Sequence, residues 1–312
     1  MSINPIVKGL LDQMAQNPAP KLWELAPEDG RAMYMAMAQL LEPQDVPIGR
    51  SEDMTAPGPA GPIPVRVYTP MGAGNVVPAL VYFHGGGFVI GNRDTHDALC
   101  RQLANESGFR VFSVDYRLAP EHPFPAAVED AFAAVQWVET KAAELGIDPN
   151  SIAVAGDSAG GNLAAVVCQM AKAKGAPNIG FQLLIYPTTQ ARADTPSMKA
   201  FSQGYLLEKQ SMDWFYNCYI PKDTDISDPR LSPLLASDLS GLPRAYIVTA
   251  GFDPLKDEGR AYADKLNRAG VAAVYVDYPD MIHGFFNMSG ALPQVKTAIA
   301  AAAKAMKEAL AQ

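Results

Sequence analysis

The heptapeptide Gly156-Asp157-Ser158-Ala159-Gly160-Gly161-Asn162 directly follows an apolar run at residues 152–155 and precedes a segment with helical periodicity. A strand that enters a helix through so tight a turn holds the turn residue in a strained, exposed conformation. Only very small neighbours let the flanking backbones pass each other there. The stretch therefore predicts that Ser158 stands alone at a crest, which suits a nucleophile, although an inert glycine-rich turn would have the same composition.

The composition is that of a folded chain with an acidic surface. Of the 312 residues, 48% are hydrophobic and 19% are charged, and the formal net charge is -8. This length accommodates one large α/β domain with an accessory segment, or two smaller domains. An acidic surface repels the phosphates of DNA and RNA, so nucleic-acid binding is excluded.

Neither a targeting segment nor a membrane span is indicated. The first residues hold one lysine and a broken apolar stretch, unlike the basic start and continuous apolar core of a secretory signal peptide. No run of about 18 apolar residues occurs, so we expect a soluble, cytoplasmic protein. Cys100, Cys168 and Cys218 are odd in number and widely separated, which predicts buried free thiols rather than disulfides or a metal site.

From about residue 60, short β-rich runs alternate with longer helical runs, as in βαβ units around a mostly parallel sheet. Several runs are almost continuously apolar, which is typical of strands buried between two layers of helices. The expected strands are residues 64–68, 79–83, 110–114, 152–155, 181–185, 245–249 and 273–277. The expected helices are residues 95–107, 126–144, 160–173, 260–269 and 292–310, with Gly146 and Gly270 at two helix ends.

Two segments interrupt this alternation, at residues 1–45 and 191–228. Both are rich in methionine and aromatic side chains, which form adaptable apolar surfaces. Ordinary helix packing accounts for any one of these side chains, but two outlying segments of the same kind favour a lid over an apolar pocket. The side chains concerned are Met14, Trp23, Met33, Met35, Met37, Phe201, Tyr205, Trp214, Phe215 and Tyr219.

A serine nucleophile needs a base to remove its proton and a carboxylate to orient that base. Of the four histidines, His283 follows residues 273–282, which we expect to be a strand and turn. Ligands bind at the carboxyl ends of the strands in open α/β sheets, so we predict His283 as the base. His84 precedes three glycines and is expected to fix that loop, and His96 and His122 are expected to be structural.

The carboxylate should follow another strand at the same edge of the sheet. Asp253 lies just past the expected strand at residues 245–249, with a proline behind it to stiffen the turn. Asp257 and Glu258 are alternatives, although they lie where acidic side chains favour the start of a helix. Asp157 is too close to Ser158 in sequence to reach the side of the base that faces away from the serine. It is expected to brace the turn instead.

The negative oxygen that forms when a carbonyl is attacked needs fixed hydrogen-bond donors. Gly85, Gly86 and Gly87 follow the expected strand at residues 79–83, and their backbone can approach a ligand closely because it carries no Cβ. We predict that amides of this loop, together with the amide of Ala159, form an oxyanion hole.

The order of these motifs is more informative than any one of them. His-Gly-Gly-Gly, the serine turn, Asp253 and His283 follow one another as in α/β-hydrolases of the lipase and esterase type. The chain resembles the bacterial hormone-sensitive-lipase-like family of esterases within the α/β-hydrolase fold, in the subgroup with a Gly-Asp-Ser-Ala-Gly motif. The matching stretches are residues 84–88, 115–121, 156–162, 253–255 and 283–285.

The resemblance implies an α/β-hydrolase core with a mostly parallel sheet flanked by helices, at residues 46–190 and 229–312. It also implies a helical cap built from residues 1–45 and from an insertion after the sixth strand, at residues 191–228.

The resemblance further implies that Ser158, Asp253 and His283 are the catalytic triad of an esterase for short to medium acyl chains. Neither a metal nor an organic cofactor is implied. The expected partners are a small-molecule ester and a second copy of the chain, paired through an edge strand near the C-terminus. Arg117 and Glu121 are expected to form a local charge pair.

Two other functions remain open at this stage. Some proteins of this fold are ligand receptors or adhesion scaffolds, usually after losing part of the catalytic set, whereas this sequence retains every part. An amidase or peptidase could use the same residues, because nothing in the motifs excludes the harder leaving group.

Overall fold

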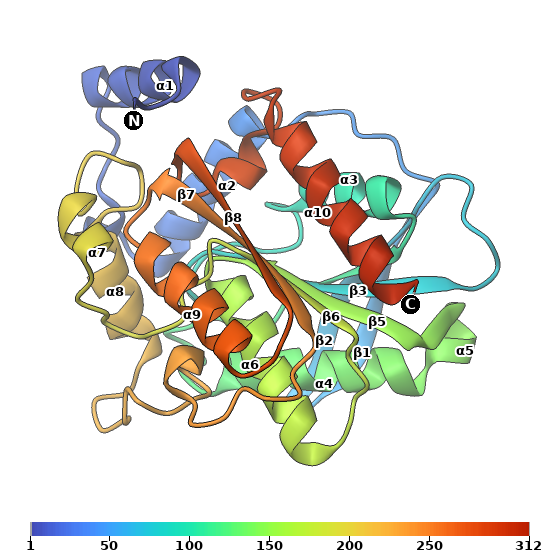
Figure 1. Cartoon of the computed structure of the whole chain (residues 1–312). Helices are drawn as coiled ribbons and strands as arrows, with labels where there is room; N and C mark the ends of the chain where they lie inside the picture. Colours follow the sequence, from blue (N-terminus) through green and yellow to red (C-terminus); the bar gives the residue numbers. More distant parts are fainter. Residues whose placement is uncertain (1, 312) are drawn as a thin grey trace.

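An open sheet forms the centre of the molecule (Figure 1). The computed structural model describes residues 2–311, and within them the sheet has eight strands in the order β1-β2-β4-β3-β5-β6-β7-β8. Strand β2 pairs antiparallel with β1 and β4, and all other neighbours are parallel. The bounds are β1 (Arg50–Gly58), β2 (Gly61–Thr69), β3 (Val77–Phe83), β4 (Arg110–Val114), β5 (Ile147–Asp157), β6 (Phe181–Ile185), β7 (Arg244–Phe252) and β8 (Ala273–Ile282). The predicted α/β fold with a mostly parallel sheet is confirmed.

Helices cover both faces of this sheet because its central strands are apolar on both faces. Along β3, Val81 and Phe83 belong to the core on one face, and Leu80 and Tyr82 belong to the core on the other. The first face is covered by α4 (Ala126–Thr140), α6 (Ala159–Lys174) and α9 (Lys256–Arg268), and the second by α3 (Asp97–Ser107) and α10 (Val295–Leu310). The burial of apolar surface on both faces makes the largest favourable contribution to the stability of such a sheet.

Most of the expected elements are found, but several of their boundaries differ from the expected ones. Strand β1 is absent from the predicted strands because its residues are mostly exposed and lack an apolar run. The helix expected at residues 126–144 breaks and continues as α5 (Ala142–Leu145), which ends at Gly146 in the left-handed conformation, as predicted. Helix α9 begins at Lys256, earlier than expected.

The two segments that interrupt the alternation lie against each other. They contain α1 (Pro5–Gln16), the short 3₁₀ helix η1 (Leu22–Glu24), α2 (Pro27–Leu41), α7 (Pro196–Ala200) and α8 (Lys209–Tyr219). Helix α8 contacts η1, and the Lys21 Nζ atom of the first segment lies 3.7 Å from a carboxylate oxygen of Glu208 in the second. Figure 1 shows α7 and α8 beside the carboxyl ends of β7 and β8, which is where the site described next is found.

Candidate active site

Ser158 occupies a sharp turn between the end of β5 and the start of α6. Its backbone angles, φ 55° and ψ -116°, are unusual for a residue with a side chain. Two glycines make the turn possible: a Cβ on Gly156 would overlap the backbone of Gly160, and a Cβ on Gly160 would overlap the carbonyl oxygen of Phe83. The predicted strand–turn–helix around Ser158 is therefore confirmed.

The histidine and the carboxylate reach this turn from two neighbouring parallel strands. His283 follows β8 directly and Asp253 follows β7 directly, so both lie at the carboxyl edge of the sheet. The His283 Nε2 atom is 3.0 Å from the Ser158 Oγ atom, and the His283 Nδ1 atom is 2.7 Å from an Asp253 carboxylate oxygen. Asp253 is fully buried, and its other carboxylate oxygen accepts a hydrogen bond of 2.8 Å from the Leu255 amide.

The alternative carboxylates are occupied elsewhere. Asp257 accepts a hydrogen bond from the Ser197 amide at 2.8 Å, and Glu258 accepts one from the Thr189 amide at 2.7 Å. Burial raises the pKa of Glu258 to about 8, which keeps it neutral over most of the physiological range. The structure thus brings Asp253, rather than either alternative, to His283.

The glycine loop after β3 lies beside Ser158 and offers unpaired amides. Within residues 2–311, the amides of Gly86, Gly87 and Ala159 donate no hydrogen bond. Gly86 and Gly87 have φ values of 115° and 59°, a region in which only glycine is unstrained. The Gly85 amide, in contrast, donates to a carboxylate oxygen of Asp157 at 2.9 Å. The inclusion of Gly85 among the oxyanion donors needs correction, because its N–H group is already used.

A family model described as alpha/beta hydrolase fold matches residues 80–287. The chain belongs to this family. The carboxylic ester hydrolase LipN of Mycobacterium tuberculosis is 52% identical over 242 residues, which are 76% of this chain but only 64% of LipN, less than two thirds of that relative. The carboxylesterase NlhH of the same organism is 43% identical over 316 residues, covering 99% of this chain and 96% of NlhH.

Solved structures agree with these relatives. The ester hydrolase EH1AB1 from the metagenome of Lake Arreo is 46% identical with a TM-score of 0.96, covering 99% of this chain and 100% of its own. The hyperthermophilic esterase of the archaeon Pyrobaculum calidifontis is 44% identical with a TM-score of 0.93, covering 99% of both chains. The chain is thus a carboxylic ester hydrolase of the hormone-sensitive-lipase-like group, as its motifs predicted.

In this esterase, Asp157 ties the serine turn to the glycine loop. Its carboxylate accepts hydrogen bonds from the Tyr82 hydroxyl at 2.7 Å and from the Gly85 amide, and lies 3.1 Å from the His96 Nε2 atom. Burial raises the pKa of Asp157, but the charge of His96 and the hydrogen bonds from His96 and Tyr82 outweigh burial and lower it. The pKa of His96 is raised, because Asp157 outweighs burial there too. The expectation that Asp157 braces the turn is confirmed.

His84 is buried under the glycine loop and is not a base for Ser158. Its Nδ1 atom lies 2.8 Å from the Gly85 carbonyl oxygen, and its ring stacks on Tyr116 with centroids 4.3 Å apart. Burial lowers the pKa of His84 to about 3, so the ring is neutral. These contacts fit the predicted role of His84 in fixing the loop.

The expected charge pair between Arg117 and Glu121 is wrong. Arg117 bonds the buried Asp130 of α4 at 2.8 Å, because a buried carboxylate requires a charged partner. Glu121 bonds Arg31 of α2 at 2.6 Å. Sequence proximity suggested a local pair, whereas both true partners come from distant elements.

The cysteines and the possible ligand clusters complete the description. All three cysteines are free; Cys100 and Cys168 are buried as expected, whereas Cys218 on α8 is only half-buried, so that prediction is wrong for Cys218. Within residues 2–311, no cluster of three or more His, Cys, Asp or Glu side chains could hold a metal ion. In the same part of the chain, no helix is long and apolar enough to cross a membrane.

Aromatic side chains of residues 191–228 contact the site. A Cβ on Gly87 would overlap the ring of Phe215, so this ring lies directly against the glycine loop. Tyr205 stacks on Phe252, the residue before Asp253, with ring centroids 5.3 Å apart. Leu206 has a φ of 71° and lies against Gly284, the residue after His283. The sequence indicated apolar side chains here but could not tell which of them reach the site.

Proposed function

We propose that Ser158, His283 and Asp253 hydrolyse carboxylic esters by two-step acyl transfer. The continuous hydrogen-bonded line from Asp253 through His283 to Ser158 is the observation that carries this proposal. Beside this line lie the unpaired amides of Gly86 and Gly87, which together with the Ala159 amide make an oxyanion hole.

In the first step, the Ser158 oxygen attacks the ester carbonyl while His283 Nε2 takes the hydroxyl proton. The carbonyl oxygen becomes negative and is stabilised by the amides of the oxyanion hole. His283 then gives its proton to the departing alkoxide, so the alcohol leaves and an acyl-serine remains. Asp253 accepts the hydrogen bond from Nδ1–H, which fixes the tautomer with Nε2 free and stabilises the positive imidazolium.

In the second step, water replaces the alcohol. His283 Nε2 takes a proton from the water as its oxygen attacks the acyl carbonyl, and the same oxyanion hole binds the negative oxygen. Collapse of this intermediate returns the proton to the Ser158 oxygen and releases the carboxylic acid. The burial of both His283 and Asp253 limits competing water around this proton path.

Replacement of Ser158 by alanine tests the assignment. We expect Ser158→Ala to lose about 10⁴-fold or more in kcat on p-nitrophenyl butyrate, since the nucleophile is removed. A fluorophosphonate should add its mass to Ser158 of the wild-type protein alone. Full turnover by the alanine variant would overturn the proposed triad.

The substrate class that we propose is esters of short to medium acyl chains, since the aromatic side chains beside the glycine loop leave limited space on that side. An amidase or peptidase activity with the same residues is tested by matched ester and anilide substrates. Equal turnover of both would place the activity with amidases. A non-catalytic receptor would show neither burst release of p-nitrophenol nor labelling of Ser158.

We further propose that residues 1–45 and 191–228 form a cap over a core made of residues 46–190 and 229–312. The contact between η1 and α8 supports this division. A covalently bound phosphonate should then slow amide hydrogen exchange in both segments together, and an unchanged exchange rate in both would contradict the cap.

Pairing through the edge of the sheet and a cytoplasmic location are the remaining proposals. Strand β8 is an edge strand, and its Val274 is 55% exposed, which suits pairing with a second copy. A monomeric mass by light scattering would exclude the dimer.

A cytoplasmic location is supported by the free cysteines, which fit a reducing compartment. Recovery of the native protein outside the cytoplasmic fraction would contradict this location.

A further inference from the structure

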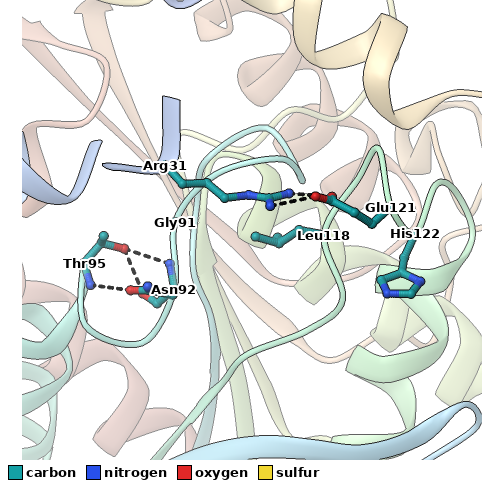
Figure 2. Close-up of a pocket in the computed structure, with 7 residues that line it drawn as sticks. All are labelled: Arg31, Gly91, Asn92, Thr95, Leu118, Glu121 and His122. Carbon is teal, nitrogen blue, oxygen red and sulfur yellow. Dashed lines mark hydrogen bonds and ion pairs between the residues drawn. The ribbon is translucent and has the colours of Figure 1, made fainter. Parts of the chain in front are cut away.

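Arg31 links the first cap segment to the backbone that follows the glycine loop. From α2, its Nε atom donates to the Val89 carbonyl oxygen at 2.9 Å, and one Nη atom donates to the Ala119 carbonyl oxygen at 3.0 Å. Both Nη atoms also bond the two oxygens of Glu121, at 2.9 and 2.6 Å. Figure 2 shows the guanidinium and Glu121 facing each other in this paired geometry.

The carbonyl group of Gly86 controls the direction of one oxyanion donor. The Gly86 C=O and the Gly87 N–H belong to one planar trans peptide unit, so they point in opposite directions. The Gly86 oxygen accepts hydrogen bonds from the Val89 amide at 3.0 Å and from the Ile90 amide at 2.9 Å. These two bonds therefore fix where the Gly87 N–H points.

The two peptide units that hold Gly86 are themselves held from outside. The unit joining Phe88 to Val89 has its carbonyl oxygen bonded by the Ala119 amide at 2.9 Å. The unit joining Val89 to Ile90 has its carbonyl oxygen bonded by Arg31. Arg31 also bonds the Ala119 carbonyl oxygen. The guanidinium therefore holds the Val89–Ile90 unit directly, and it holds the Phe88–Val89 unit indirectly through Ala119.

This loop needs outside support because its backbone is strained. Phe88 has a φ of 64°, which is unfavourable for a residue with a Cβ, and such conformations persist only where the surroundings fix them. The Glu121 side chain is 47% exposed, and exposed ion pairs contribute little by themselves. The contacts of Arg31 with the backbone carbonyls are part-buried, and they are thus the ones that act on the loop.

We infer that Arg31 is a positioning residue for the oxyanion hole, which couples the seating of the cap helix α2 to the direction of the Gly87 amide. This inference rests on the proposed function. Among the described residues, Arg31 bonds no member of the triad; it acts through Val89 and Ala119. A lysine cannot replace it, because a single ammonium group cannot bond two carbonyls and a carboxylate in the planar fork of arginine.

A pocket of about 370 Å³ opens beside the guanidinium, lined in part by Arg31, Leu118 and Glu121 (Figure 2). A small cation can therefore reach this position from solvent when the side chain is shortened. Ethylguanidinium is the fragment that Arg31→Ala removes, so it is a suitable probe for chemical rescue.

The experiment compares Arg31→Ala, Arg31→Lys and Glu121→Gln, with Arg260→Ala as a control arginine on the exposed side of α9. Both Arg31 variants should lower kcat on p-nitrophenyl butyrate about 10- to 100-fold with KM changed less than about threefold, since misplacing one donor costs less than deleting it. The inhibition constant of a trifluoromethyl ketone, whose serine adduct carries an oxyanion, should rise by the same factor. Glu121→Gln retains the contacts of Arg31 with the two carbonyls, so its kcat should fall less than about threefold. Ethylguanidinium should restore the kcat of Arg31→Ala.

Three results would overturn the inference: wild-type kcat in both Arg31 variants, an unchanged trifluoromethyl ketone affinity despite a lower kcat, or a loss in Glu121→Gln as large as that in Arg31→Ala. Should Arg31→Ala fail to fold, Arg31→Lys keeps a charge for Glu121 and gives the same test. Ser158→Ala measured alongside separates the outcomes, since full activity there would refute the proposed function, whereas active Arg31 variants beside an inactive Ser158→Ala would refute only this inference.

Discussion

The serine turn and the segment at residues 191–228, which we propose to be part of a cap, border the same site but are held in opposite ways. Around Ser158, the glycines are buried against backbone atoms, and Asp157 is bonded on several sides. In the insertion, Phe215 and Tyr205 are half-buried and held mainly by contacts between rings. A region fixed by backbone contacts tolerates no added atom, whereas a region fixed by side-chain packing can change shape at moderate cost. We therefore expect substitutions to abolish turnover in the first region and to alter substrate preference in the second.

The largest effect is expected from Gly160→Ala. The added Cβ would overlap the carbonyl oxygen of Phe83 and approach the backbone of His84, neither of which can move without disrupting the sheet. We expect a loss of about 3 kcal/mol or more in unfolding free energy and loss of measurable turnover. Thermal unfolding measures the stability, and the rate of p-nitrophenyl butyrate hydrolysis measures the turnover.

A second glycine provides the control for this prediction. A Cβ on Gly9, in the exposed helix α1, meets nothing within 4 Å. Gly9→Ala should therefore keep full activity, and its free energy of unfolding should rise by about 0.5–1 kcal/mol, since alanine favours the helix. Wild-type stability and activity in Gly160→Ala would show that the turn is less constrained than its contacts indicate.

A smaller and different effect is expected from Phe215→Ala. Its ring lies against Gly87, so its removal opens space beside the glycine loop without adding a clash. Because the ring is only half-buried, we expect a loss of about 1–3 kcal/mol in stability. The preferred acyl chain should lengthen, with kcat/KM for the acetate ester falling about tenfold relative to that for the octanoate ester.

A series of p-nitrophenyl esters from acetate to decanoate measures this shift. Leu40→Ala is the control, because Leu40 on α2 is 82% exposed and its side chain therefore packs against little of the protein. An unchanged chain-length profile in Phe215→Ala would mean that the wall of the acyl site lies elsewhere, and the contrast between the two regions would lose its main support.

The same contrast explains what could be predicted from the sequence. The parallel strands, the serine turn and the convergence of Asp253 with His283 are specified by short motifs and by the rule that parallel strands end at one edge. The engagement of the Gly85 amide could not be predicted, because it depends on where the Asp157 carboxylate comes to lie. Arg31 was missed because its backbone partners are distant in sequence and no local pattern marks them.

The smallest effect on turnover is expected at the seam of the two regions, where Glu258 of α9 holds the Thr189 and Gln190 amides that lead from β6 into the insertion. Burial raises its pKa from the ordinary 4.5 to about 8, so the folded protein keeps a proton that the unfolded chain loses. The contribution of Glu258 to the unfolding free energy is therefore fully present below about pH 4.5 and is lost as pH rises through about 8.

Glutamine cannot lose a proton, so Glu258→Gln should flatten the fall in unfolding free energy between pH 5 and 8. It should change kcat at pH 7 less than about twofold. Glu42, whose pKa burial also raises to about 8, should give a change of the same sign when replaced by glutamine. Urea unfolding at several pH values measures the slopes, and a wild-type slope in Glu258→Gln would show that Glu258 is already ionised in the folded protein.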